Sequence, residues 1–343
     1  MKLNHSEINL TAILVLATTL TACGGGSTGD DGTTTPAARS TMTIDASNAE
    51  SISGLAYDGI DQQQNSTAVD LTGSSISSSS SQTAQAVGKV TNDYLSLNNN
   101  QNTVATAALT TGTPSCNGGG SVTVTTTSIV YADCRTNYPD NSYEITNGSA
   151  AILNLAQSGS IISCTKNSSG TYSFNNLTEL EYDQADNLVD STVVNGSISF
   201  SLSQSLVDTV CTTSSSIYGT SFSMKSDTDS VGLFNFNIDG KTDTSFNYSS
   251  SYNVTMDISS LSGSLKVETL APIAGVATNT YPTSGHIRIT ANSTTAGVPA
   301  LIDVVIDSSN NGGEVTLTLD VDGTAGTDAG YPKTMSWAEF EAL

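Results

Sequence analysis

The stretch Phe246-Asn247-Tyr248-Ser249-Ser250-Ser251-Tyr252-Asn253-Val254-Thr255-Met256-Asp257-Ile258 decides the fold class of this chain. Aromatic or aliphatic side chains occupy alternate positions from Phe246 to Ile258, with Ser250 as the exception, and every residue between them is polar. A period of two is typical of a β-strand with one buried face and one wet face. The stretch therefore indicates an antiparallel sheet.

The same alternation recurs along the chain from about residue 121 onward. By this template the chain holds about 12 to 16 strands. No proline falls between Asp140 and Ala271, which fits interior strands, because proline cannot donate a hydrogen bond to its neighbour. The clearest further cases of alternation are 197–203, 234–238, 302–306 and 315–321.

We expect a mainly β fold, as a large antiparallel sandwich or a closed or half-closed barrel, with two short N-terminal helices and a short C-terminal helix. So many one-sided strands carry more apolar surface than three short helices can cover. The sheet must therefore fold on itself as a sandwich or curl around a cavity.

Capping signals place these helices. Ser47 and Glu50 have the spacing of a capping box, and the apolar residues after them follow a helical period. A second helix is predicted over 83–97, beyond a serine-rich loop at 75–81. Ser336 and Glu339 repeat the capping-box spacing and predict a short helix at the end of the sequence.

Glycine-containing triplets precede several of the alternating segments. Asn147-Gly148-Ser149 and Asn195-Gly196-Ser197 are two examples. Because Asn and Gly tolerate the positive φ angles of hairpin turns, these triplets predict turns ahead of strands.

The N-terminal segment carries an export signature. An apolar run over 8–17 is too short to cross a bilayer as a stable helix, and Leu20-Thr21-Ala22-Cys23 follows it. This motif resembles the lipobox of bacterial lipoproteins. The resemblance implies that 1–22 is a lipoprotein signal peptide and that Cys23 carries acyl chains such as palmitate, as a stable membrane anchor. Gly24 in place of Asp implies sorting to the outer membrane. The alternative is a plain signal peptide with an incidental Cys23.

The rest of the chain divides by composition. Residues 23–40 are rich in Gly, Ser and Thr and are expected to form a flexible tether. Residues 41–343 form a β-rich body with a helical N-terminal part at 41–100, and two subdomains remain an alternative. The whole pattern is similar to Ser/Thr-rich β lipoproteins of Gram-negative bacteria. That likeness transfers no functional residue beyond Cys23.

The net charge of −22 excludes one class of partner. With ten Lys and Arg residues in 343, the chain has no basic patch for nucleic acid. Anionic membrane surfaces should repel it as well, so the lipid is expected to provide the anchoring. The acidity itself is typical of a soluble extracytoplasmic protein.

Four cysteines remain beside Cys23. An even number in an oxidising compartment predicts two disulfides, for which three connectivities are possible. We favour Cys116 with Cys134, and Cys164 with Cys211, because a glycine-rich stretch and a local strand pair separate the first two. No C-x-x-C redox motif is present.

Candidate chemistry in the sequence is sparse. His286 is expected to be an exposed strand residue, since no G-x-S-x-G nucleophile elbow occurs. Glu179 with Glu181, and Asp183 with Asp186, are the carboxylate pairs that a glycosidase would need. We expect no catalytic residue among them, because acidic pairs arise by chance in so acidic a chain.

A calcium site is the one cofactor that the sequence suggests. Asp320, Asp322 and Asp328 surround a turn at Gly323, and hard oxygen ligands of this kind suit Ca²⁺. The spacing departs from that of an EF-hand, so the alternative is an ordinary acidic turn at the end of a strand.

Three functions are compatible with these features. Non-catalytic binding of an apolar ligand or lipid is expected if the sheet curls around a cavity. A structural or adhesin-like surface module that contacts an envelope protein is expected if the sheet forms a dry sandwich. A glycan-acting enzyme comes third, since no catalytic constellation is evident.

Overall fold

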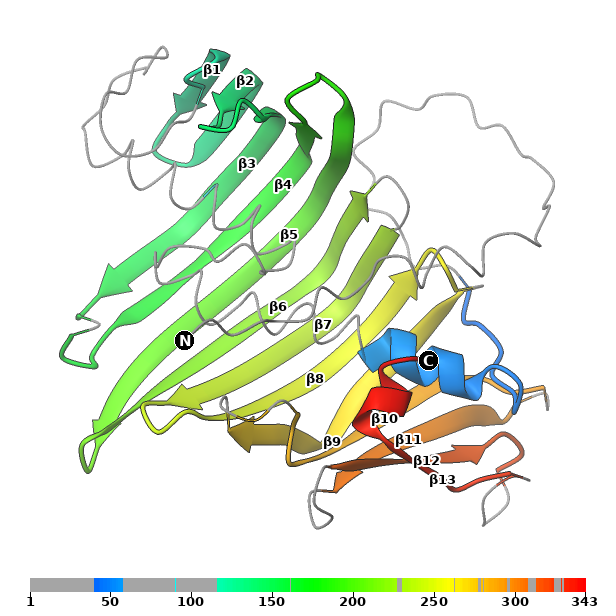
Figure 1. Cartoon of the computed structure of the whole chain (residues 1–343). Coiled ribbons are helices and arrows are strands. Elements are labelled where there is room, and N and C mark those ends of the chain that lie inside the picture. The colour runs from blue at the N-terminus through cyan, green and yellow to red at the C-terminus, as the bar shows by residue number, and fades with distance from the viewer. Residues whose placement is uncertain are drawn as a thin grey trace. The chain divides into compact units, whose positions relative to one another are not determined.

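A computed structural model describes residues 40–57, 90, 116–160, 162–226, 230–261, 263–276, 279, 281–294, 297–307, 313–323, 328 and 330–343. These residues lie within one compact unit, Thr35–Leu343. They form a single antiparallel sheet of thirteen strands, and each strand pairs with the next one along the chain (Figure 1). Since β1 and β13 are the two edges, the sheet is open. No helix among these residues is long and apolar enough to cross a bilayer.

The strand bounds follow chain order. The strands are β1 (Gly119–Val124), β2 (Ser128–Asn137), β3 (Tyr143–Ser158), β4 (Asn167–Tyr182), β5 (Leu188–Val207), β6 (Val210–Ser226), β7 (Ser230–Asp243), β8 (Asn247–Ile258), β9 (Ser264–Val276), β10 (Ser284–Asn292), β11 (Pro299–Asp307), β12 (Glu314–Asp320) and β13 (Lys333–Ser336).

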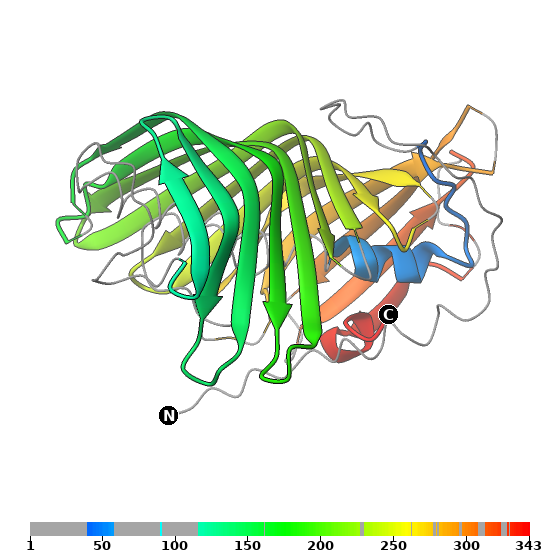
Figure 2. The same ribbon diagram turned by 90° about the horizontal axis from the view of Figure 1, so that it is seen from above.

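The predicted fold class is confirmed. The sheet is curved, and the described helices lie on its concave side (Figure 2). Over the described residues, this single open sheet is neither the sandwich nor the closed barrel, and among the predicted architectures it agrees with the half-closed barrel. We call the helix side of the sheet the inner face.

Alternation along the strands builds that inner face. In β8, Tyr252, Val254, Met256 and Ile258 are buried, whereas Asn253 between them is exposed. Buried side chains from β1 to β12 and from the helices join one continuous hydrophobic core. Each fully buried Leu, Ile, Met or Phe side chain contributes about 1.5–3 kcal/mol relative to exposure.

The first predicted helix is present over 49–57, but its capping differs from the prediction. The carbonyl of Asp45 accepts from the backbone N–H groups of Asn48 and Ala49, and the Asn48 side chain accepts from the Asp45 N–H. The predicted partner Glu50 instead forms an ion pair with Lys333. The capping box at Ser47 is therefore wrong. Of the second predicted helix, 83–97, only Val90 lies within the described residues, and it is helical and buried.

The C-terminal helix α3 (Trp337–Phe340) is confirmed with its cap. The Ser336 hydroxyl accepts from the Glu339 N–H, and the Glu339 carboxylate accepts from the Ser336 N–H. Trp337 is 1 % exposed, and its ring stacks on Tyr281 at 5.5 Å and contacts Tyr57 at 5.3 Å. This aromatic group joins α3 to the helix over 49–57, and both helices lie at the β9–β13 end of the sheet (Figure 1).

The two Asn-Gly-Ser triplets lie inside strands, so the prediction of turns there is wrong. Gly148 (φ +98°) is in β3 and Gly196 (φ +101°) is in β5, next to register shifts in the pairing with the following strand. A Cβ on Gly148 would lie 2.1 Å from the carbonyl oxygen of Asn176 in β4. The triplets therefore make β-bulges, where the same positive φ is needed as in a turn.

Candidate functional site

The inner face changes character along the strands β2 to β5. In β4 the inward-facing residues run from Tyr172 and Phe174 through Leu177 to Glu179 and Glu181. A bulge between Phe174 and Leu177 shifts the inward positions from even to odd numbers, so that one face stays continuous. The inner face thus has an aromatic section in its middle and carboxylates at one end.

The aromatic section consists of Tyr172, Phe174, Phe200 and Phe222 on β4, β5 and β6. All four side chains are at most 4 % exposed. Tyr172 stacks on Phe200 with ring centroids 5.5 Å apart, and Phe174 meets Phe222 edge-on at 6.1 Å. Phe174 and Phe222 are the register partners of Gly196, which separates them and has no side chain of its own.

The acidic row consists of Glu144, Glu181 and Asp190 on β3, β4 and β5. Glu144 is directly opposite Glu181, and Glu181 is directly opposite Asp190. Side chains opposite one another across antiparallel strands share a face, with Cβ atoms roughly 4.5–5.5 Å apart. Three like charges therefore lie side by side, an arrangement that by itself destabilises the sheet.

Hydroxyl groups surround the buried end of this row. Glu144 is 8 % exposed and accepts hydrogen bonds from the Thr146 hydroxyl at 2.7 Å and from the Tyr138 hydroxyl at 3.0 Å. Glu181, by contrast, is exposed. Desolvation by nearby protein atoms, and then the charges of Asp190 and Glu144, raise the pKa of Glu181 above its usual range. Water around the exposed carboxylate screens part of this effect.

The two predicted carboxylate pairs lie in different parts of the structure. Glu179 lies on the same face as Glu181, beside the acidic row, opposite Thr146 and Thr192. Asp183 lies in the β4–β5 connection and accepts from the side chain of Asn187 and from two backbone N–H groups. The hydrogen bond from the Asn187 side chain, followed by those backbone bonds, lowers the pKa of Asp183. Asp183 therefore serves the turn.

Sequence reasoning missed Glu144 and Asp190. Each is separated from Glu181 along the chain, and only the strand register brings the three together. The one available signal was the position of each acid at the end of an alternating segment.

The disulfides pair as favoured from the sequence. Cys116 bonds to Cys134, and Cys164 bonds to Cys211. Cys134 is opposite Thr146, so the first disulfide lies next to the acidic row. The second precedes β4 and joins its connection to the start of β6. The first bond thus joins the turn before β1 to β2, and the second joins the β3–β4 connection to β6, while Cys23 lies outside the described residues.

In the predicted calcium turn, two carboxylates accept hydrogen bonds from the backbone of the turn itself. Asp320 accepts from the N–H groups of Asp322 and Gly323, and Asp328 accepts from the Val321 N–H at 2.7 Å. Within the described residues, no three His, Cys, Asp or Glu side chains are placed to hold a metal ion. Calcium binding at this turn stays a prediction.

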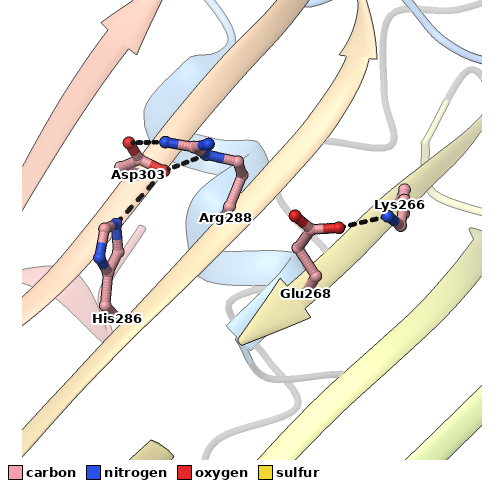
Figure 3. A network of polar contacts seen from close by, with 5 residues as sticks. All are labelled: Lys266, Glu268, His286, Arg288 and Asp303. Atoms are coloured by element: carbon pink, nitrogen blue, oxygen red, sulfur yellow. Dashed lines mark hydrogen bonds and ion pairs between the residues drawn. The ribbon is translucent and has the colours of Figure 1, made fainter. Parts of the chain in front are cut away.

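His286 lies on the outer face of the sheet, in β10. Its Nε2 is 3.4 Å from an oxygen of Asp303 in β11, and Arg288 binds the same carboxylate through two N–H groups at 2.7 and 2.8 Å (Figure 3). Lys266 and Glu268 form a second ion pair on β9 (Figure 3). The Arg288–Asp303 pair joins neighbouring strands, an arrangement that stabilises their pairing, whereas Lys266 and Glu268 pair along one strand.

Comparisons with family models, with curated proteins and with solved structures find no match for this chain.

Proposed function

We propose that this chain is a non-catalytic binding protein of the bacterial envelope and that it holds an apolar ligand or lipid on the inner face of its sheet. The curvature of the open sheet around its inner face is the observation that carries the proposal (Figure 2). Ligand sites are lined mainly by apolar and aromatic side chains, with a few polar groups that orient the ligand. The inner face has this composition, since its middle is apolar and aromatic and the acidic row lies at one end.

The position of the described helices supports the same assignment. The helix over 49–57 and α3 pack at the β9–β13 end, whereas the aromatic section lies on β4 to β6 (Figure 1). Stability and binding would then use different parts of one curved sheet.

Native mass spectrometry of residues 24–343 tests this proposal. The protein is produced in an oxidising compartment and incubated with envelope lipids. We expect a lipid-sized adduct that is weakened in Phe200→Leu and retained in Phe340→Leu. Both residues are buried Phe side chains, so the two substitutions should cost a similar amount of packing energy. Only Phe200→Leu removes a ring from the aromatic section. A bare protein mass after incubation would contradict the proposal.

The anchor is a second part of the proposal. We infer that acylated Cys23 ties the protein to the outer membrane, supported by the motif before it and by the two disulfides, which are typical of exported proteins. Cys23→Ser should move the full-length protein from the membrane fraction to the soluble fraction. Continued membrane association of that variant would overturn the anchor.

A surface-interaction role has one observation in its favour. Exposed apolar side chains gather at the strand connections beside the second disulfide, where Ile162 is 99 %, Val207 62 % and Phe246 62 % exposed. A photo-crosslinking residue at position 246 should then capture an envelope protein in cells, while one at the exposed control position 270 should not. Equal capture at both positions would argue against this candidate.

A further inference from the structure

Three neighbouring strand connections carry exposed apolar side chains at one end of the long strands. They are the β3–β4, β5–β6 and β7–β8 connections, which lie next to one another along the same side of the sheet (Figure 1). Each of the four side chains concerned is more than half exposed. We call them the tip patch, which consists of Ile162 in the first connection, Leu206 and Val207 beside the second, and Phe246 in the third.

We propose that the tip patch inserts into the surface of a lipid bilayer. This inference goes beyond the ligand on the inner face, and it rests on the proposed anchor only for bringing the protein to a membrane. Apolar side chains that enter a bilayer surface lie about 5–10 Å deep, at the boundary between head groups and acyl chains. Connections that protrude from a sheet can place side chains at that depth while the sheet itself stays in water.

Contacts between the three connections hold the patch in one arrangement. The disulfide between Cys164 and Cys211 joins the first connection to the second. The Cys211 N–H donates to the Thr244 hydroxyl at 3.1 Å, and its carbonyl accepts from the Thr244 N–H at 3.0 Å, which joins the second to the third. Because the connections are already ordered, insertion costs less conformational entropy than it would for free loops.

Phe246 has an unfavourable backbone angle and an exposed ring. Its φ is +65°, a left-handed value that is uncommon for a bulky residue. The Asp243 carboxylate holds this turn by accepting from the N–H groups of Ser245 and Asn247, at 2.8 and 3.0 Å. Gly or Asn would adopt the angle at less cost, and an exposed ring gains no burial within the protein. The combination points to a role for the ring outside the folded body.

The charges along the long strands favour contact of this end with a membrane. Near the tip patch the described charges balance, since Lys166 and Lys241 match Asp208 and Asp243. At the other end of β2 to β6 the described acids outnumber Arg135 and Lys225; they are Asp140, Glu144, Glu179, Glu181, Asp183, Asp186 and Asp190. Anionic head groups repel acidic residues, so the tip end can approach a bilayer more readily than the acidic end.

The chain before the body is long enough for this orientation. Ser40 accepts from the Ser264 N–H at the start of β9, and the tip patch lies towards the other end of that strand. The 13 residues of β9 extend about 43 Å at a rise of about 3.3 Å per residue. The chain from Cys23 to Ser40 spans up to about 60 Å when fully extended. An acylated Cys23 and the tip patch can therefore reach the same bilayer.

Fluorescence quenching by brominated lipid tests the insertion. Val207 and Val189 are 62 % and 61 % exposed and lie near opposite ends of β5, so Val207→Trp and Val189→Trp form a matched pair. Each variant of residues 24–343, which include every described residue, is mixed with excess phosphatidylcholine vesicles that carry bromine on their acyl chains. The unaltered protein, with its buried Trp337, gives the baseline. We expect Val207→Trp to lose on the order of half of its added emission and Val189→Trp to lose none.

Polar substitutions at the two ends locate the binding energy. Val207→Ser/Phe246→Ser should lower the partition coefficient into phosphatidylcholine vesicles roughly 10-fold or more, as flotation measures it. Leu188→Ser/Val189→Ser removes exposed apolar side chains from the acidic end and should leave partitioning unchanged. All four positions are exposed, so both variants should keep the fold.

The outcomes separate this inference from the proposed function. Equal quenching in Val207→Trp and Val189→Trp would overturn the tip patch as the inserting surface. Absence of quenching in Val207→Trp would overturn insertion altogether, while the ligand on the inner face and the anchor at Cys23 would still stand or fall by their own experiments. If quenching were absent and a crosslinker at position 246 captured one envelope protein, the tip patch would be a protein contact instead.

Discussion

The two ends of the sheet solve the same packing problem differently. Strands β10, β11 and β12 are seven to nine residues long, and their pairing runs without a register shift. Strands β3, β4 and β5 are sixteen to twenty residues long, and every pair from β2–β3 to β5–β6 contains a shift. The short end lies against two helices, and the long end carries the aromatic section and the acidic row.

The difference shows what a bulge does in a long strand. Each bulge adds a residue on one strand, bends it and increases its twist. In β4 it also lets Leu177 follow Phe174 on the inner face despite the odd spacing. The regular end is therefore expected to carry most of the packing energy of the helices, and the bulged end to carry the ligand.

The largest loss of stability is expected from a substitution in α3, which packs at the regular end of the sheet. Trp337→Ala removes a ring that Tyr57, Tyr281 and Phe340 surround. Replacing a buried Trp by Ala costs about 4 kcal/mol, which denaturant unfolding measures. Ligand binding to the protein that remains folded should be unchanged, because the aromatic section is elsewhere on the sheet.

Leu343→Ala is the control for this end, since Leu343 is 40 % exposed and should cost under about 1 kcal/mol. A similar loss of stability in both variants would show that α3 contributes little specific packing.

A smaller loss of stability is expected from a substitution at a bulge in the long strands. Gly148→Ala places a Cβ against the carbonyl oxygen of Asn176 at a φ of +98°, so the backbone of β3 or β4 must move. We expect a loss of about 3 kcal/mol from strain and displacement together, measured by the same unfolding experiment.

Gly297→Ala separates the two causes. Gly297 has a similar φ of +83° but open space around its Cβ position, so the loss should be about 1 kcal/mol. Equal losses at both positions would mean that Gly148 is needed only for its φ angle and that the close strand approach has no cost.

The smallest effect concerns the charge of the acidic row. Because the pKa of Glu181 is raised in the folded protein, its charged form destabilises the fold above that pKa, and this cost disappears below the unfolded value near 4.5. Glu181→Gln should therefore stabilise the ligand-free protein at pH 7 by a few tenths of a kcal/mol. The gain should vanish as the pH falls below about 4.5, as thermal unfolding across pH would show.

Asp303→Asn should change stability in the opposite direction from Glu181→Gln. Burial alone would raise the pKa of Asp303, but the hydrogen bonds and charge of Arg288 outweigh it and lower the pKa. Its contribution is present above the usual value of 3.8 and is lost as the pH falls through the lowered one. Asp303→Asn should thus lower the free energy of unfolding at pH 7. If Asp303→Asn and Glu181→Gln changed that free energy in the same direction, the charge assignments would be contradicted.

The strands of this fold could be predicted from the sequence more accurately than the register in which they pair. Alternation correctly placed Ile198, Phe200 and Leu202 on the inner face, because period two is local information. It could not show that Asn147-Gly148 and Asn195-Gly196 lie in mid-strand, because a bulge and a hairpin turn require the same backbone angles.

Strand register limited the prediction of the site in the same way. The sequence itself identifies Glu179 and Glu181 as neighbours along one strand, whereas Glu144 and Asp190 lie beside Glu181 only through the pairing of β4 with β3 and β5. Register depends on tertiary packing and on the bulges, so one sequence does not contain it in readable form.

Photolabelling tests the central claim, that the inner face of the long end holds an apolar ligand, most directly. An envelope lipid bearing a diazirine in its chain is irradiated with the protein, and the labelled peptides are identified by mass spectrometry. We predict that the label lies on the inner face of β4, β5 and β6 and that the unlabelled lipid displaces it. Labelling confined to β10–β12 or to the outer face would contradict the account.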